Sequence, residues 1–241
     1  MDPDSNKPAY KRVLVKLSGE ALMGPGEYGI HTPTVHFICQ QVKEIKELGT
    51  EIGLVVGGGN IFRGMKAAER GMDRVTGDNV GMLATVMNSL ALMDALEKMG
   101  MFTRVMSAVQ VEAFAEPYIR RRAVRHMEKG RLVIFAGGTG NPYFSTDTAA
   151  SLRAMEVGAQ LMVKATNVDG VYSADPKKDP NAKFYSKLCY MDVLTMELKV
   201  MDSTAISLLK DNRIPVRVIN LGTPGNLKRV VMGDDVGTLI C

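Results

Sequence analysis

Short runs of β-branched and aliphatic residues alternate along the chain with longer stretches whose apolar positions recur every three to four residues. The short runs predict buried strands at 12–17, 51–56, 102–106, 131–136 and 160–163. The three-to-four spacing predicts helices at 35–48, 79–98, 117–129 and 147–157. Alternating strands and helices indicate a mainly parallel sheet covered on both faces. We therefore expect an α/β fold, a three-layer αβα sandwich.

The two ends of the chain complete this pattern. Residues 1–10 are polar and predict a flexible lead-in. After 163 the sequence predicts a polar loop at 173–183, short helices, and strands at 216–219 and 238–240. We expect residues 11–241 to form one domain.

Composition narrows the class of protein. The chain has 241 residues, of which 46% are hydrophobic and 23% charged, as in ordinary soluble globular proteins. Its net charge of +4 suits an anionic small-molecule ligand and is too weak to indicate nucleic acid. Cys39, Cys189 and Cys241 are odd in number and far apart in sequence, so we expect a reducing, cytoplasmic compartment. With no run of about 18 apolar residues and no signal peptide, we expect no membrane segment.

Four predicted strands end in unusual chemistry: Lys16–Gly19, Gly57–Asn60, Gly137–Asn141 and Lys164–Asn167. In a parallel sheet these ends meet at one edge, where ligands bind. Glycine turns let backbone N–H groups approach an anion closely. One such turn is as often a plain connection, but two indicate two phosphate sites, with Lys16 as a candidate phosphate clamp.

Several common catalytic motifs are absent from the sequence. It contains no GxxxxGK[ST], no complete GxGxxG after a strand, no HExxH and no GxSxG. His31, His36 and His126 lack nearby carboxylates or cysteines, so we expect surface or packing roles for them. Hydrolase and metalloprotease functions are therefore disfavoured.

Three aspartates and a group of arginines each allow either a structural or a functional interpretation. Asp78 and Asp147 are either helix N-caps or ligand-binding groups, and Asp175 is either a turn residue before proline or a sugar-binding group. The arginines at 120, 121, 122 and 125 are flanked by Glu116 and Glu128 and have no aromatic residues among them. A solvated helix face is favoured there over a nucleic-acid site.

Six segments form an ordered set: KLSGEAL (16–22), VVGGGNIFRG (55–64), GDNVGMLATVMN (77–88), GTGNPYFSTDTAA (138–150), KATNVDGVYSADP (164–176) and KVMD (199–202). With them the chain resembles, from residue 11 to its end, the bacterial uridylate kinases of the amino acid kinase family. The resemblance implies phosphorylation of UMP to UDP in pyrimidine nucleotide biosynthesis, by direct in-line transfer from ATP with Mg²⁺. It implies no dedicated protein cluster for the metal.

The resemblance also assigns site residues. It implies catalytic roles for Lys16, Arg63 and Asp147. It implies ATP contacts from Lys16, Leu17, Ser18, Gly19, Gly59, Arg63, Thr166, Tyr172 and Asp175. It implies UMP contacts from Gly58, Asp78, Thr139, Gly140, Asn141, Pro142, Tyr143, Phe144, Ser145 and Thr146.

Regulation and assembly follow from the same likeness. The loop formed by Gly24, Pro25, Gly26, Glu27, Tyr28 and Gly29 resembles an allosteric region associated with GTP activation, although its composition also fits a plain flexible loop. UTP inhibition and a homohexamer are likewise implied. The methionine-rich helix at 79–98 is then either a subunit contact or internal core.

Two other functions remain open from the sequence. One is a phosphotransferase of the same fold acting on a carboxylate or carbamate, which the 138–147 loop disfavours. The other is a noncatalytic nucleotide sensor or RNA-associated regulator, motivated by the arginines at 120–125.

Overall fold

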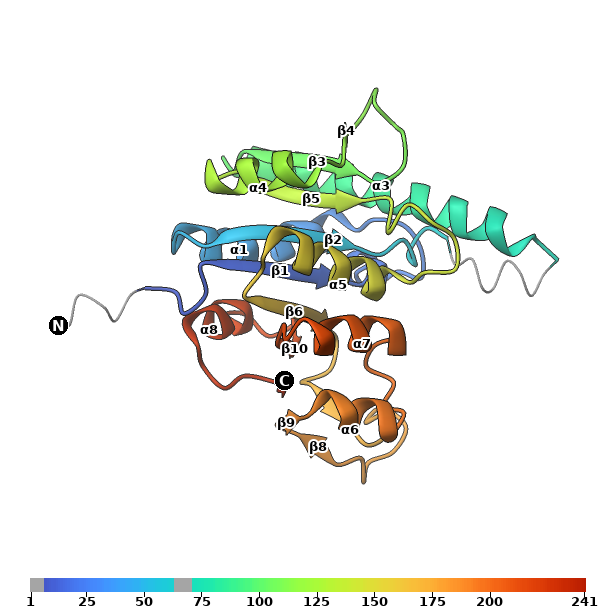
Figure 1. Ribbon diagram of the computed structural model, residues 1–241, viewed down its shortest axis with the longest axis vertical. Coiled ribbons are helices and arrows are strands. Elements are labelled where there is room, and N and C mark those ends of the chain that lie inside the picture. Colours follow the sequence, from blue (N-terminus) through green and yellow to red (C-terminus); the bar gives the residue numbers. More distant parts are fainter. Residues whose placement is uncertain (1–6, 63–70) are drawn as a thin grey trace.

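The computed structural model describes residues 7–62 and 71–241, in which a nine-stranded sheet forms the middle layer (Figure 1). Its strand order is β4-β3-β5-β2-β1-β6-β10-β11-β9, and only the β10–β11 pair is antiparallel. The strands are β1 Arg12–Leu17, β2 Glu51–Val56, β3 Thr103–Ser107, β4 Glu116–Pro117, β5 Leu132–Ala136, β6 Leu161–Thr166, β9 Lys187–Leu188, β10 Val216–Asn220 and β11 Thr238–Ile240. A separate hairpin pairs β7 Val171–Tyr172 with β8 Phe184–Tyr185.

Helices cover both faces of the sheet. One face packs against α1 Thr32–Glu47, α3 Arg74–Lys98 and α8 Asn226–Met232. The other packs against α4 Arg120–Glu128, α5 Thr146–Val157 and α7 Ser203–Asp211, with α6 Tyr190–Thr195 beside α7. A single turn of 3₁₀ helix, η1 Gly19–Leu22, follows β1. The predicted three-layer αβα sandwich is confirmed.

Alternation along the central strands decides which side chains face α5. In β1, Val13, Val15 and Leu17 enter the core beneath α1, whereas Leu14 enters the core beneath α5. Successive side chains of a strand point to opposite faces, so Lys16 shares the α5 face with Leu14. The same alternation in β6 puts Lys164 on the α5 face. The two lysines are partners in the β1–β6 register.

Three predicted helix starts differ from the structure, and the first of these helices, α1, begins at Thr32 rather than at 35. The helix expected at 79 begins at Arg74, because Asp73 caps it by accepting a hydrogen bond from the Thr76 amide at 2.8 Å. The helix expected at 117 begins at Arg120. Residues 116–117 instead pair with β3, where Pro117 is tolerated because β4 is an edge strand.

The long helix α3 is also apolar enough, by length and composition alone, to span a membrane. Of the described helices, it is the one that passes this test, with 44% of the apolar window buried inside the fold. Core helices of soluble proteins pass the same test. Since α3 packs on α1, β3 and β5, we assign it to the core layer.

Candidate active site

Lys16 and Lys164 meet the carboxylate of Asp147 at the carboxyl ends of β1 and β6. The Lys16 Nζ lies 2.8 Å from Asp147 Oδ1, and the Lys164 Nζ donates a 2.6 Å hydrogen bond to Oδ2. All three side chains are largely buried. The sequence marked both lysine-bearing strand ends, and the structure brings them together on one acid.

Burial and charge act on this cluster in opposite directions. Burial raises the pKa of Asp147, but the charges of Lys16 and Lys164 outweigh it and hold that pKa below its usual value. Burial lowers the pKa of Lys164, partly opposed by Asp147. The carboxylate therefore remains ionised and suits orienting two ammonium groups rather than accepting a proton.

Asp147 is not the N-cap of α5. Ser145 fills that position, and its Oγ accepts hydrogen bonds from the amides of Asp147 and Thr148, both at 3.0 Å. The Asp147 carboxylate is therefore free to turn toward the lysines. The capping alternative for this residue is wrong.

Asp202 fastens the start of α5 to α7. It caps α7 and accepts hydrogen bonds from Ser145 Oγ and, at 2.8 Å, from Thr148 Oγ1. Asp202 ends the KVMD segment that contributes to the family resemblance, but the resemblance implied no role for this residue. Its place directly before Ser203, the first residue of α7, was the available signal, because aspartate is a preferred N-cap.

We number the glycine turns in chain order: Gly19 after β1 is in the first, residues 57–60 after β2 form the second, and residues 137–141 after β5 form the third. The first two turns pack directly against each other. A Cβ on Gly19 would lie 2.6 Å from both Asn60 Oδ1 and the Gly59 nitrogen. Gly58 is equally confined, because a Cβ there would lie 2.8 Å from the Gly81 carbonyl of α3. These glycines therefore allow backbone to approach backbone beside the lysine cluster.

A reciprocal amide pair holds the second turn in place. Asn88 of α3 donates to the Gly57 carbonyl and to Asn60 Oδ1, both at 2.7 Å, while Asn60 Nδ2 donates to Asn88 Oδ1 at 3.0 Å. Both side chains are buried. Sequence reasoning gave neither residue a role, although an asparagine directly after three glycines was a signal for the first.

The third glycine turn leads into the loop expected to bind UMP. The Gly137 amide donates to Thr85 Oγ1 at 2.8 Å, and the Tyr143 amide donates to Asp78 Oδ2 at 2.8 Å. Asp78 also pairs with Arg74 at 2.8 Å. It therefore lies inside α3 and tethers this loop, and the capping alternative for Asp78 is wrong.

Tyr143 carries backbone strain at this point. Its φ of 72° lies in the left-handed region, which is uncommon for a bulky residue. Such strain persists where surrounding contacts fix the conformation and often accompanies ligand-binding sites. The side chains of Tyr143 and Phe144 are both exposed.

A cavity of about 1220 Å³ opens beside the lysine cluster. Of the residues expected to contact ATP, it is lined by Lys16, Ser18, Thr166, Tyr172 and Asp175. Leu17 differs, because its side chain is wholly buried in the core beneath α1 and only its backbone can serve a ligand. The structure thus gathers most of this set from two stretches of the chain, 16–18 and 166–175.

Individual side chains of the cavity wall are fixed by local contacts. Thr166 Oγ1 donates to the Val168 carbonyl at 2.7 Å. Tyr172 packs edge-on against Phe184, with ring centroids 5.3 Å apart. Asp175 Oδ1 accepts a 3.0 Å hydrogen bond from the Lys177 amide, so the turn interpretation of this residue holds while it also lines the cavity.

The loop expected to bind GTP borders the same cavity. Gly24 lines it, and Gly29 exchanges two hydrogen bonds with Asn60, each of 2.9 Å. The loop is therefore connected to the second glycine turn, and an effector role for it stays a prediction. Gly59 belongs to that turn, whereas Arg63 lies outside the described residues.

The arginines of α4 form a different surface. They line a hollow of about 720 Å³ with Glu116, Glu128 and Arg131. The Arg125 guanidinium lies 3.3 Å from Glu128, and Arg131 bonds His126 at 3.0 Å. The Arg125–Glu128 pair lies within α4, and such a pair is typical of a solvated helix face.

Residues 11–220 match the family model described as the amino acid kinase family. The chain belongs to this family. It is similar to the crystal structure of a UMP kinase from Bacillus anthracis, with a TM-score of 0.93, 44% identity and 96% of each chain covered. It is also similar to the crystal structure of a UMP kinase from Ureaplasma parvum, with a TM-score of 0.89 and 36% identity, over 95% of this chain and 98% of that chain.

A solved structure of lower sequence identity has a similar fold. A uridylate kinase from Archaeoglobus fulgidus aligns with a TM-score of 0.75 and 29% identity, over 95% of this chain and 99% of that chain. The predicted family and fold are therefore confirmed.

Proposed function

We propose that this chain transfers the γ-phosphoryl group of ATP to UMP, giving UDP and ADP. The observation that carries the proposal is the Lys16–Asp147–Lys164 cluster, which lies beside a cavity large enough for a nucleotide. The 44% identity to a bacterial UMP kinase over nearly the whole chain supports UMP as acceptor.

In this reaction an oxygen of the UMP phosphate attacks the γ-phosphorus, and the bond to the bridging oxygen of ADP breaks. A phosphate monoester is largely ionised at neutral pH, so the nucleophile needs no general base. The transition state is loose, and catalysis consists mainly of alignment and charge stabilisation. Lys16 and Lys164 supply positive charge from a rigid sheet, and Asp147 fixes their positions.

The two substrates would occupy different sides of the cluster. We assign ATP to the cavity lined by Thr166, Tyr172 and Asp175, with its phosphates toward Ser18 and the glycine turns. We assign UMP to Gly58, Asp78 and residues 139–146. The tether from Asp78 to the Tyr143 amide supports a preformed acceptor loop. Arg63 keeps its proposed role at the transferred phosphate.

Mg²⁺ fits this site as a companion of ATP. Within residues 7–62 and 71–241, no three His, Cys, Asp or Glu side chains are grouped to hold a metal, and lysines occupy both oxygens of Asp147. Mg²⁺ commonly binds through substrate phosphates and water. Bound there, it would neutralise charge on the β- and γ-phosphates.

Assembly is proposed from the surface of α3. Leu83 and Met87, one turn apart, are 50% and 54% exposed, and the amino-terminal part of α3 extends past the sheet in Figure 1. Unpartnered apolar side chains on a long helix favour a subunit contact. We propose a homohexamer with α3 at an interface, GTP as activator, UTP as inhibitor and a cytoplasmic location. Native mass spectrometry of the wild type and Leu83→Glu tests the interface.

An acceptor panel tests the proposed reaction. ADP release from ATP and Mg²⁺ is measured with UMP, CMP, AMP, acetate and carbamate. We expect efficient turnover with UMP alone. Preference for a carboxylate or carbamate would favour another phosphotransferase of this fold, and nucleotide binding without turnover would favour a regulatory protein.

A further inference from the structure

Cys189 and Cys241 are distant in sequence but opposite each other across two neighbouring strands. β9 and β11 are parallel, with Lys187 paired to Leu239 and Leu188 to Ile240. The Cys241 amide continues this ladder by donating to the Leu188 carbonyl at 3.2 Å. The next pair in register is therefore Cys189 with Cys241.

Strand spacing predicts that the Cα atoms of the two cysteines lie within the range that a disulfide can span. Neighbouring strands lie about 4.8 Å apart, inside the window of about 4.4–6.8 Å that disulfides span between Cα atoms. Side chains of paired residues in parallel strands point to the same face. Leu188 and Ile240 point into the core, so the adjacent cysteines share the opposite face, and both are exposed.

The residue that follows Cys189 also lies near Cys241. After burial, the charge of Cys241 is the second cause that raises the pKa of Tyr190 to about 12. Tyr190 directly follows Cys189 in the chain. Cys39 contrasts with both, because it is wholly buried and burial raises its pKa to about 12. The chain thus carries two accessible thiols and one inert thiol.

We propose that Cys189 and Cys241 form a redox-sensitive thiol pair, which a small-molecule disulfide converts to an intramolecular disulfide. The thiolate of one cysteine attacks a sulfur of the oxidant and displaces one small thiol, leaving a mixed disulfide. The second protein thiolate then attacks the protein sulfur of that bond and displaces the other small thiol. Two protein thiols are oxidised, one small disulfide is reduced, and both protons remain in solution or on the released thiols.

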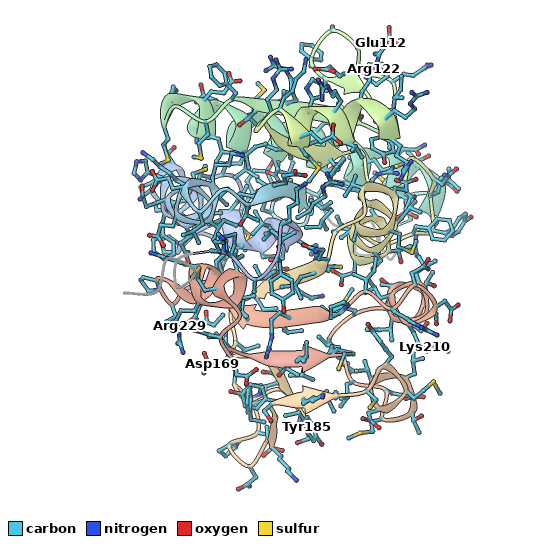
Figure 2. The ribbon with its side chains drawn as sticks, turned by 60° about the vertical axis from the view of Figure 1, so that its left-hand side comes forward. Glu112, Arg122, Asp169, Tyr185, Lys210 and Arg229 are labelled. Atoms are coloured by element: carbon cyan, nitrogen blue, oxygen red, sulfur yellow. The ribbon has the colours of Figure 1, made fainter. Side chains whose placement is uncertain are left out.

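The bond would join two walls of the nucleotide cavity. Cys189 precedes α6, and the following segment 196–200 lines the cavity. At its other end, β11 holds the β7–β8 hairpin: Thr238 Oγ1 accepts from the Val171 amide at 2.8 Å and donates to the carbonyl of Tyr185, which is labelled in Figure 2. Tyr172 of that hairpin also lines the cavity.

Cross-linking these walls would therefore affect donor binding. This consequence depends on the proposed function, because it assigns ATP to the cavity. Restricting the walls lowers the ordering cost of binding, so we expect the KM for ATP to fall about threefold on oxidation, with the KM for UMP unchanged.

Thiol counting and peptide mapping test the bond without any activity assay. The full chain is incubated with oxidised glutathione, and free thiols are titrated after denaturation. We expect the number of free thiols to fall from three to one, with Cys39 the remaining thiol and a Cys189–Cys241 cross-linked peptide that dithiothreitol releases. The melting temperature of the wild type should rise by about 5 °C on oxidation.

Matched variants separate the possible outcomes. Cys39→Ser should still form the cross-link, whereas Cys189→Ser and Cys241→Ser should each form only mixed disulfides. Separate glutathione adducts on both cysteines of the wild type, or cross-links between chains, would overturn the proposal. If the bond forms and the KM for ATP is unchanged, the coupling to the cavity is wrong, and activity of the reduced protein tests the proposed function separately.

Discussion

Lys16 and Lys164 are register partners on β1 and β6, and both reach one carboxylate, that of Asp147. Two ammonium groups at this spacing repel each other unless an anion lies between them. Asp147 fulfils that role in the described structure, and a phosphate approaching from the cavity would add a second anion. The stability of the folded protein should therefore depend on the negative charge of Asp147 between the two lysines.

The first prediction concerns Lys16. Lys16→Ala should lower kcat on the order of 10²- to 10³-fold, because one preorganised positive group is lost at the transferred phosphate. Steady-state kinetics with UMP and ATP check it. Lys98→Ala is the matched control, since Lys98 is exposed and forms an ion pair with Asp94 at 2.6 Å, away from the lysine cluster. Equal kinetics for the two variants would contradict the role of Lys16.

The second prediction concerns Asp147 and pH. Asp147→Asn should destabilise the protein by about 3 kcal/mol at pH 7, because two buried ammonium groups lose their partner. The folded pKa of Asp147 lies below its usual 3.8. Between those two pKa values the unfolded chain binds more protons, so stability rises with pH there.

The contribution of the Asp147 charge to the free energy of unfolding should thus be complete above about pH 4. It should disappear as the pH falls through the folded pKa of Asp147. Urea unfolding of the wild type and the variant between pH 7 and pH 2 measures the difference. A gap in unfolding free energy that stays constant down to pH 2 would show that charge pairing is not its cause.

The third prediction concerns the amide pair beneath the second glycine turn. Asn88→Ala should cost about 1–3 kcal/mol, because the Gly57 carbonyl and both polar groups of the Asn60 amide lose a buried partner. It should also raise the KM for ATP, since the turn loses its support.

Asn88→Asp keeps the size of the side chain but removes its donor. It should therefore resemble Asn88→Ala in the KM for ATP. Asn212→Ala is the control, because Asn212 is exposed at the end of α7 and its side chain donates to the nearby Leu208 carbonyl at 2.9 Å. A wild-type KM for Asn88→Asp would rule out the positioning role.

The fourth prediction concerns the acceptor loop. Asp78→Asn should raise the KM for UMP about tenfold and leave the KM for ATP unchanged, because a charged hydrogen-bond acceptor of the Tyr143 amide is lost. Asp94→Asn on the exposed side of α3 provides the control. A rise in the KM for ATP alone would place Asp78 on the donor side.

Local sequence patterns predicted the sheet and the ligand-binding edge at the carboxyl ends of its strands, because both follow from short-range periodicity. Lys16 and Lys164 were identified as strand ends in this way. Their shared contact with Asp147 could not be predicted from spacing, because it depends on how α5 packs over β1 and β6. The cap of that helix could not be chosen from the sequence, because Ser145 and Asp147 are both preferred capping residues.

Other features depend on tertiary contacts that leave no local signal. Asn88 lies within the apolar helix α3, and its role comes from contact with Asn60, which lies in the turn after β2. Cys189 and Cys241 are distant in sequence and become neighbours only through the β9–β11 pairing. At Pro117, pairing with β3 determined the local structure instead of the helical pattern that follows it.

Competition among acceptors tests the central claim most directly. The protein is given Mg²⁺, ATP and equal concentrations of UMP, CMP and AMP, and the diphosphate products are separated and quantified over time. We predict that UDP forms with a kcat/KM at least about 100-fold above the others, because a site built to hydrogen-bond uracil rejects bases that lack its groups. Comparable formation of CDP, or ATP consumption without UDP, would contradict the account.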